Sequence, residues 1–561
     1  MSVFIGYPSF MAYQMMKGKK GNNDGFPSIP GMIARYSASG LTNEQMAANP
    51  VWVDKTGNGH DLQMKNFAWG GMSGVGGYEM NFNLWTNNVP SIPDISMSTT
   101  TTSVSVSVGN STYNNNLIYI HMNNWDINKN HWLKVTSTYE DGDLVFKFYN
   151  DNNSKNIELP ANGYVNIPAY PEFKGNYMYI STTSNKQGSF TIEQLPLYPG
   201  ALVFDGVDDY GVCENFPILT KEKGYTVVAL RQWITRGEGA LGLVSNVKNW
   251  LNNGAFLLEY RNIQADHLNK PISFGAIGSE MDLPHILTYQ TSKSCNGVSI
   301  TTGNFEGTDV LHVGKLAPTN VGTCINAAIW ELVFLDHDAT EEELTKIKDY
   351  FVKTYPWLFP DQAWTVVGKT NEDEDRATIA NITGNGNDLI LSNFGFAEGS
   401  GYNEQGEYAG YLVTDGVDDI ASSNTIIYEA DFTFIGEWKF IQKDDTVAGI
   451  SSIRHLYIQN RYNRGATIMI NSTFESKKNI TDYMTFKAIT SKGKAYDENW
   501  NEVDLLYGDG YKGPSGVNIG GQGGTEFCHM IFKNMALYMN KVFSKDDCIK
   551  AYNYLQTLKA K

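Results

Sequence analysis

The stretch ALVFDGVDDY (Ala201–Tyr210) decides the fold, because it occurs again as YLVTDGVDDI (Tyr411–Ile420). A second matched pair lies upstream of these turns, with DKTGNGHDL (Asp54–Leu62) against NITGNGNDL (Asn381–Leu389). Matched blocks in the same order indicate a tandem duplication, and a repeat must be found before the rest of a chain is interpreted. We call the first repeat copy A and the second copy B.

A third matched block runs without gaps, as Cys324–Phe351 in copy A and Cys528–Leu555 in copy B. In copy A it contains the nearly all-apolar Ile325–Leu335, the pattern of a strand buried on both faces. One amphipathic helix is expected to follow in each copy. Thr340 begins a capping box in copy A, and Ser544 opens the second helix. The predicted unit is therefore a set of strands closed by one short helix.

The copies diverge between their first two matched blocks. Gly57 lies 148 residues before Asp205, whereas Gly384 lies 31 before Asp415, so copy A holds 117 extra residues. Alternating runs such as SVSVSV (Ser103–Val108) predict an antiparallel β-sandwich for this insertion. The expected parts are an N-terminal anchor segment (1–32), sandwich A (33–83 plus 200–357), an inserted sandwich (84–199) and sandwich B (361–561).

Composition restricts the class of protein. The chain has 561 residues, which is enough for several domains, and 54 Gly and 32 Tyr with 18% charged residues favour β structure with many turns. A net charge of −17 argues against nucleic acid or an anionic membrane as the main partner. No apolar run is long enough to span a bilayer, and the N-terminal twenty residues lack the charge order of a secretory signal. Five scattered cysteines predict no disulfide framework.

These motifs together resemble the concanavalin A-like, laminin G-like lectin and glucanase superfamily. The resemblance covers both copies and leaves out the head piece and the insertion. It implies an all-β chain of tandem jelly-roll sandwiches. IEQLPLYPGALVFDGVDDY (Ile192–Tyr210) also resembles proteins of crAss-like bacteriophages and their Bacteroides hosts. That narrower resemblance implies a virion fibre or decoration protein, or a host surface glycan-binding protein.

The sequence contains no familiar catalytic motif. Glucanases that this chain resembles carry Glu-x-Asp-x-x-Glu on a strand, because a retaining mechanism needs two carboxylates on one face. That spacing is absent, and Glu372–Asp375 is an acidic run in a predicted loop. The nine histidines give no metal-ligand spacing, and no nucleophile elbow or phosphate-binding loop occurs. We therefore expect no enzyme and no cofactor, with a glycoside hydrolase or lyase as the weaker alternative.

The repeated Asp-Gly-Val-Asp-Asp stretch admits two interpretations. Its carboxylates, Asp205, Asp208 and Asp209 in copy A and Asp415, Asp418 and Asp419 in copy B, would supply calcium ligands as in some relatives of the fold. The favoured alternative is a tight turn in which Asp accepts from backbone N–H groups and Gly supplies positive φ. Calcium usually needs six or more converging oxygens, and a backbone turn is what a repeat must reproduce.

Carbohydrate binding needs aromatic platforms in polar loops. Trp125 in NNWDINKN, Trp250 in VKNWLNN and Trp500 in DENWNEVD are the candidates, because Asn and Asp beside an exposed ring can bind sugar hydroxyls. In the competing interpretation each indole ring packs against its own sandwich and is not available to a ligand. For any single tryptophan we favour this second interpretation.

The leading hypothesis is a structural or adhesive protein of a phage particle, located in the virion. Its N-terminal segment would bind other virion proteins, the subunits would form a homo-oligomer, with a trimer favoured, and host surface polysaccharide would be the ligand. A bacterial surface glycan-binding protein is the alternative. It requires an export route that the N-terminus does not display.

Overall fold

The computed structural model describes residues 24–87, 95–109, 120–121, 125–126, 131–150, 153–167, 170, 173, 177–182, 187–220, 222–235, 241–246, 257–260, 287–296, 298–299, 308–315, 324–441, 447–452, 456–461, 465–470, 485–505, 513–522 and 526–560. Strands hold 45% of the chain and helices 11%, which confirms the all-β class. Among the described helices, none combines the length and the apolar character needed to cross a membrane. The proposed N-terminal anchor lies largely outside the described residues.

The chain divides into two compact units. One holds residues 1–85, 99–104 and 196–355, and the other holds 86–98, 105–195 and 356–561. The first unit is essentially copy A. The second holds copy B and most of the insertion, although the insertion interrupts copy A in the sequence.

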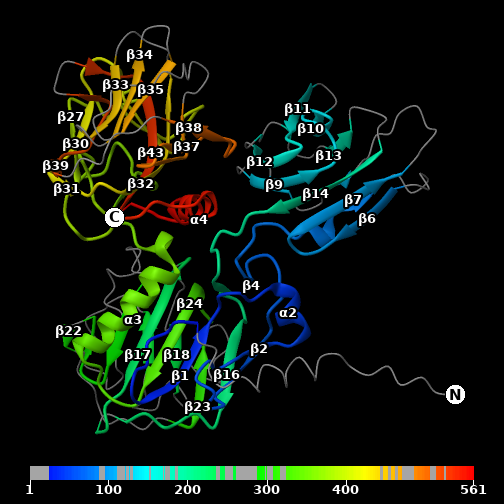
Figure 1. Ribbon diagram of the computed structural model, residues 1–561, viewed down its shortest axis with the longest axis vertical. Coiled ribbons are helices and arrows are strands. Elements are labelled where there is room, and N and C mark those ends of the chain that lie inside the picture. The colour runs from blue at the N-terminus through cyan, green and yellow to red at the C-terminus, as the bar shows by residue number, and fades with distance from the viewer. Residues whose placement is uncertain are drawn as a thin grey trace. The chain divides into compact units, whose positions relative to one another are not determined.

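Copy A consists of two antiparallel sheets (Figure 1). The eight-stranded sheet has the order β22-β21-β20-β17-β24-β15-β4, with β1 also paired to β24, and the six-stranded sheet has the order β19-β18-β23-β16-β3-β2. The first sheet comprises β1 (Met32–Ser37), β4 (Gly74–Val75), β15 (Leu202–Asp205), β17 (Thr226–Trp233), β20 (Leu287–Thr291), β21 (Ser294–Cys295), β22 (Val298–Ser299) and β24 (Asn326–Leu335). The second comprises β2 (Val51–Trp52), β3 (Leu62–Lys65), β16 (Tyr210–Glu214), β18 (Leu241–Ser245), β19 (Leu257–Tyr260) and β23 (Val310–Val313).

One apolar core joins the two sheets of copy A. Leu62 and Met64 are buried, while Gln63 and Lys65, which alternate with them, are exposed, as the two-residue period of a half-buried strand requires. These side chains share a cluster with Ile329 from the other sheet. Burial of this apolar surface is the main favourable term holding the two sheets together.

Copy B repeats this topology strand for strand. Its larger sheet has the order β28-β29-β43-β32-β36-β37-β38, with β25 paired to β43, and its smaller sheet has β26-β27-β30-β40-β33-β34, extended by β35. Even the β-bulge recurs, between Leu230 and Arg231 in copy A and between Glu437 and Trp438 in copy B.

The larger sheet of copy B comprises β25 (Gln362–Thr365), β28 (Gly401–Asn403), β29 (Tyr411–Val413), β32 (Phe432–Phe440), β36 (Ala488–Thr490), β37 (Lys494–Tyr496), β38 (Glu502–Asp504) and β43 (Met530–Met539). The smaller comprises β26 (Thr378–Ile379), β27 (Leu389–Ser392), β30 (Ile420–Ser423), β33 (Val447–Ser452), β34 (Leu456–Arg461), β35 (Gly465–Ile470) and β40 (Asn518–Ile519). Two further strand pairs are β31 (Ile426–Tyr428) with β39 (Gly513–Ser515) and β41 (Gly521–Gln522) with β42 (Glu526–Phe527).

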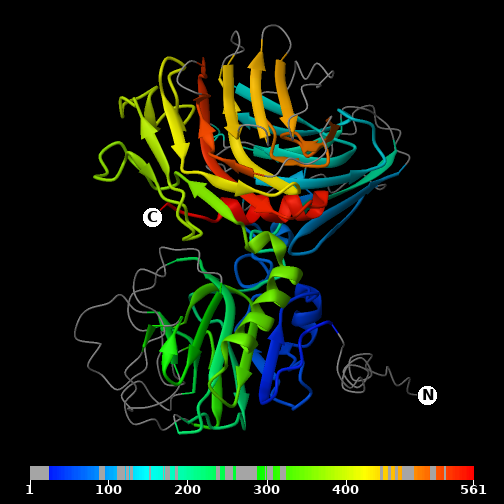
Figure 2. The ribbon, with the colours of Figure 1, turned by 60° about the vertical axis from the view of Figure 1, so that its left-hand side comes forward.

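Each copy ends in the expected helix, α3 (Glu341–Thr354) and α4 (Lys545–Gln556) (Figure 2). Thr340 and Glu343 form the predicted capping box, and Ser544 caps α4. α3 ends at Thr354, before Pro356, because proline cannot continue a helix, and a 3-10 turn follows at Pro356–Leu358. Short helical segments also occur at Asn43–Ala48 (α2) and Phe82–Leu84.

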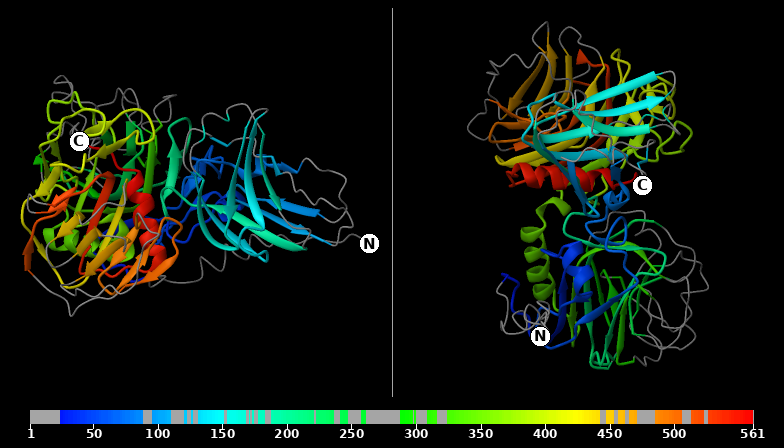
Figure 3. Two further views of the ribbon diagram at one scale, coloured as in Figure 1. Left: turned by 90° about the horizontal axis from the view of Figure 1, so that it is seen from above. Right: turned by 90° about the vertical axis from the view of Figure 1, so that its right-hand side faces the viewer.

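The insertion forms two five-stranded sheets of its own. Its strands are drawn in blue and cyan in Figure 3. The valines of the predicted SVSVSV strand are buried at alternate positions, as its period of two requires. One sheet comprises β5 (Thr86–Asn87), β8 (Ile120–His121), β10 (Leu144–Asn150), β11 (Asn153–Leu159) and β13 (Tyr177–Thr182). The other comprises β6 (Ile95–Thr99), β7 (Ser103–Val108), β9 (His131–Ser137), β12 (Asn162–Ile167) and β14 (Gly188–Gln194).

Candidate functional site

The repeated aspartate turn makes the same hydrogen bonds in both copies. Asp205 Oδ1 accepts from the backbone N–H of Val207 at 2.8 Å, and the N–H of Asp205 donates to Asp209 Oδ2 at 3.1 Å. The matching distances in copy B are 2.7 and 2.9 Å. Gly206 and Gly416 have φ of 80° and 76°, as the turn requires. The turn interpretation therefore describes these aspartates well.

The third aspartate of each turn also fixes a neighbouring loop. Ser73 Oγ donates to Asp209 Oδ1 at 3.0 Å, and Ser400 Oγ donates to Asp419 Oδ1 at 3.1 Å. Burial raises the pKa of Asp209 to about 7 and that of Asp419 to about 6. Both carboxyl groups thus close two loops at the edge of a sheet.

A metal at these turns is not needed to explain them. Carboxylate oxygens of the three aspartates lie within 4.8 Å of one another in each copy. The buried carboxylate nevertheless has both oxygens engaged by protein donors, and three residues fall short of the six or more oxygens that calcium usually takes. Calcium binding remains a prediction.

The structure corrects two of the three sugar-platform candidates. Trp125 is 7% exposed and packs against His131 and Phe146, with centroids 4.2 and 4.7 Å away. Trp500 is 1% exposed and packs against Tyr552. Neither ring offers a face to a ligand, because an indole ring gains more by burial in a core. Trp250 lies outside the described residues.

The polar flanks of Trp500 have a local explanation. Asp497 Oδ1 accepts from the N–H groups of Asn499 and Asn501, both at 2.8 Å. These bonds form a tight turn that holds Trp500 at a φ of 61° and directs its ring inward. The Asp and Asn residues around the tryptophan therefore build a turn, which the sequence pattern did not distinguish from a ligand site.

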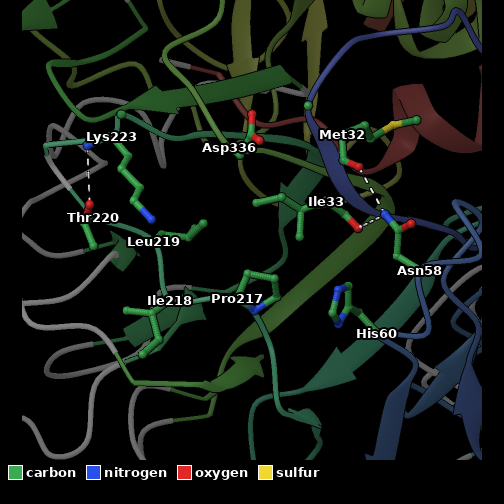
Figure 4. Close-up of a pocket in the computed structure, with 12 residues that line it drawn as sticks. Met32, Ile33, Asn58, His60, Pro217, Ile218, Leu219, Thr220, Lys223 and Asp336 are labelled. Atoms are coloured by element: carbon green, nitrogen blue, oxygen red, sulfur yellow. Dashed lines mark hydrogen bonds between the residues drawn. The ribbon is translucent and has the colours of Figure 1, made fainter.

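A pocket of about 400 Å³ in copy A is the strongest candidate site (Figure 4). Four chain segments converge on it: the start of β1, the Gly-Asn-Gly-His turn, the β16–β17 connection and the residue after β24. Twelve residues line it: Gly31, Met32, Ile33, Asn58, His60, Pro217, Ile218, Leu219, Thr220, Lys223, Gly224 and Asp336.

The pocket combines a buried apolar base with an exposed rim. Ile33 and Leu219 are 8% and 3% exposed, whereas Ile218 on the rim is 52% exposed. Asn58 holds the turn beneath the pocket by donating to the carbonyl oxygen of Ile33 at 2.8 Å. The His60 ring packs edge-on against Phe216, with centroids 5.3 Å apart. Apolar walls with a few convergent polar groups are the usual composition of a small-molecule site.

Two opposite charges lie on the pocket rim. The backbone N–H of Lys223 donates to Thr220 Oγ1 at 3.3 Å, which fixes the loop that carries the lysine. Asp336 Oδ1 lies 3.1 Å from His337 Nδ1, and the other ring nitrogen of His337 is 3.2 Å from Glu343. These carboxylates raise the pKa of His337 against the opposing effect of burial. Asp336 is therefore engaged by a histidine from its own chain.

Sequence reasoning missed this pocket. The matched blocks contained a signal, because GNGHDL and GNGNDL differ only at His60 and Asn387. Because the turn is otherwise repeated, its backbone conformation does not require a particular residue at His60 or Asn387, and this position is free to serve a function in one copy.

Beneath its closing helix, each copy also buries charged groups. In copy A, Arg35 Nε donates to Glu331 at 3.1 Å, and Tyr355 donates to the same carboxylate at 2.8 Å. Burial raises the pKa of Glu331, and Arg35 opposes this by favouring the ionised form. In copy B, Glu437 accepts from Tyr411, and Lys533 lies 3.6 Å away. Lys533 and Lys487 together lower the pKa of Glu437 against the opposing effect of burial.

Comparison with known proteins gives weak likenesses. No protein-family model matches the chain, and no curated protein is significantly similar. A Trypanosoma rangeli sialidase in complex with sialic acid is 10% identical, with 84% of this chain and 86% of that chain covered and a TM-score of 0.24. A structure of botulinum neurotoxin type C, described as dependent on two ganglioside molecules for cell entry, is 11% identical over 60% and 90% at a TM-score of 0.23. The tandem CBM22 domain of Paenibacillus barcinonensis Xyn10C is 9% identical over 47% and 91% at 0.13.

The expectation that the chain is not an enzyme is corrected by these comparisons. Six matches with probability 1.00 are sialidase structures, and sialidases are enzymes. The TM-scores of these matches, 0.24–0.26, are too low to transfer a reaction or a catalytic residue to this chain. The absence of a familiar motif is therefore no ground for excluding catalysis, because active sites are recognised by geometry and not by sequence spacing alone.

Proposed function

We propose that this protein is a structural or adhesive subunit of a bacteriophage particle that binds a host surface glycan through the pocket of copy A. In this proposal the two copies are concanavalin A-like modules, and the N-terminal segment binds other virion proteins in a homo-oligomer, with a trimer favoured. The supporting observation is the pocket itself, which presents an apolar base and polar rim groups within about 400 Å³.

The geometry suits a sugar ring in two ways. Ile33, Leu219 and Ile218 offer apolar surface to the C–H face of a ring. Asp336 can accept from sugar hydroxyls, and Lys223 and His60 can donate to oxygens. A sugar ring presents both kinds of surface, so such a lining can bind one without a tryptophan platform.

Glycan binding is tested with the full chain on a panel of host surface oligosaccharides. Ile218→Asp should weaken binding by about tenfold or more, because it removes apolar contact with the ring and places there a carboxylate that binding would have to desolvate. Ile427→Asp is the matched control, since Ile427 is 74% exposed on copy B. Equal binding by both variants would contradict the pocket assignment.

The virion role is tested separately by mass spectrometry of purified particles. The chain should be present in intact particles and should remain after a high-salt wash. Its absence from the particle would refute the structural role while leaving the glycan test unaffected.

A further inference from the structure

The two copies share one backbone framework beneath the pocket. In copy A, the side-chain amide of Asn58 donates to the carbonyl oxygen of Ile33 at 2.8 Å. In copy B, Asn385 donates to the carbonyl oxygen of Asp361 at 3.0 Å. The framework is therefore common to both copies and does not by itself create a binding site.

The side chains on that framework differ between the copies. His60 of the turn is replaced by Asn387, and Asp336 after β24 is replaced by Asn540 after β43. The loop also differs in length, since ten positions separate Phe216 from Thr226 and seven separate Ile426 from Thr433. The longer connection in copy A is the one that carries Lys223.

Charge at the end of this connection is reversed between the copies. In copy B, Asp431 immediately precedes β32 and pairs with Lys492 at 2.6 Å. In copy A, Lys223 is exposed on the pocket rim, and no ion pair to its amine occurs within the described part of the chain. The nearby acid of the pocket, Asp336, lies against His337 at 3.1 Å. A pocket in a chain of net charge −17 thus presents an available cation.

We propose that the pocket of copy A selects a saccharide bearing a carboxylate, such as a uronic acid, with the Lys223 amine binding the carboxylate. This rests on the glycan-binding function proposed above and names the class of sugar. A charge-assisted hydrogen bond to an ammonium contributes more than a neutral one. The apolar base formed by Ile33 and Leu219 distinguishes a sugar acid from inorganic phosphate, which has no apolar face to bury.

The test compares two oligosaccharides of equal size, one with glucuronic acid and one with its carboxyl group reduced to the alcohol. Binding of each to the full chain is measured by calorimetry. Wild type should prefer the acidic form by about tenfold or more, since a hydrogen bond to a charged group contributes roughly 1.5–3 kcal/mol. Lys223→Gln should abolish that preference, because it should weaken binding of the acidic sugar far more than binding of the reduced sugar.

Lys348→Gln on α3 is the matched control, because Lys348 is exposed and away from the pocket lining. It should retain the preference for the acidic sugar. If Lys223→Gln kept that preference, or if wild type bound both sugars equally in an Ile218-dependent way, the acidic class would be refuted and glycan binding would stand. If wild type bound no glycan of the panel, both proposals would fail.

Discussion

Copies A and B have the same strand order and the same aspartate turn, yet they carry different side chains around the pocket of copy A. Val207 and Val417 at the turn tips are each 69% exposed, and both carboxylates beside them make matching bonds. At the pocket, by contrast, His60 and Lys223 have no counterpart of the same chemistry in copy B. The repeated residues maintain the backbone, and the divergent ones mark where function was free to develop.

The buried charges below α3 and α4 differ in the same way. Copy A pairs Arg35 with Glu331, whose side chains are 3% and 0% exposed. Copy B pairs Glu437 with Lys533, whose side chain is 26% exposed. The two copies therefore share the same sheet and closing helix, but the ion pair buried beneath the helix is made by different residues in each copy.

Removing one partner of the buried pair should have the largest effect on stability. Arg35→Met leaves Glu331 without its cation, and an uncompensated buried charge costs about 3–5 kcal/mol. Lys533→Met should cost less, because Lys533 is more exposed to solvent than Arg35 and Glu437 keeps Lys487 as a second cation. The measurement is the free energy of unfolding from denaturant titration. If both variants lost the same free energy of unfolding, the different exposure of Arg35 and Lys533 would not affect the stability of the two copies.

The double variant Arg35→Met, Glu331→Leu supplies the control for that experiment. It removes both charges, so it should recover most of the stability lost by Arg35→Met alone. No recovery would mean that packing, and not charge, explains the loss.

The paired turns should differ in their response to pH. The folded-state pKa of Asp209 is raised to about 7 and that of Asp419 to about 6, both from a usual 3.8. The stability that each contributes is complete below pH 3.8 and is lost as the pH rises through 7 in copy A and through 6 in copy B. After allowance for solvent screening, each contribution is on the order of 2 kcal/mol.

Unfolding at pH 5, 6, 7 and 8 tests this difference between the turns. Asp209→Asn should flatten the pH dependence up to about pH 7 and Asp419→Asn only up to about pH 6, so the two variants should differ mainly between pH 6 and 7. Identical pH profiles for the two variants would be inconsistent with the different pKa values of the two carboxyl groups.

Two glycines of copy B should show a smaller difference in stability when replaced by alanine, because one has only a positive φ and the other also has a close neighbour. Gly416 and Gly384 have nearly equal φ, 76° and 77°, but only at Gly416 would an added Cβ meet the backbone, at 3.0 Å from His529 N. Gly384→Ala should cost about 1 kcal/mol from positive φ alone. Gly416→Ala should cost about 1 kcal/mol more, because its neighbours must shift. Thermal unfolding measures both, and equal costs would place the whole effect in backbone strain.

Much of the architecture was readable from the sequence. The duplication, the alternating strands and the capping box of Thr340 appear in the structure because each depends on local spacing. The tryptophan platforms were wrong at Trp125 and Trp500 for the opposite reason. Whether a polar-flanked ring lies outside or inside depends on which distant partners the fold brings to it, and Tyr552 is revealed as the partner of Trp500 only by the folded chain.

The sequence by itself determined the all-β class, the repeat and its turns, because periodicity and glycine placement act over a few residues. Only the tertiary structure decided that Ile33, His60, Lys223 and Asp336 line one pocket, since these residues are separated by as many as three hundred positions. It alone also paired Arg35 with Glu331. Long-range contacts follow from how whole sheets pack, and no local pattern encodes them.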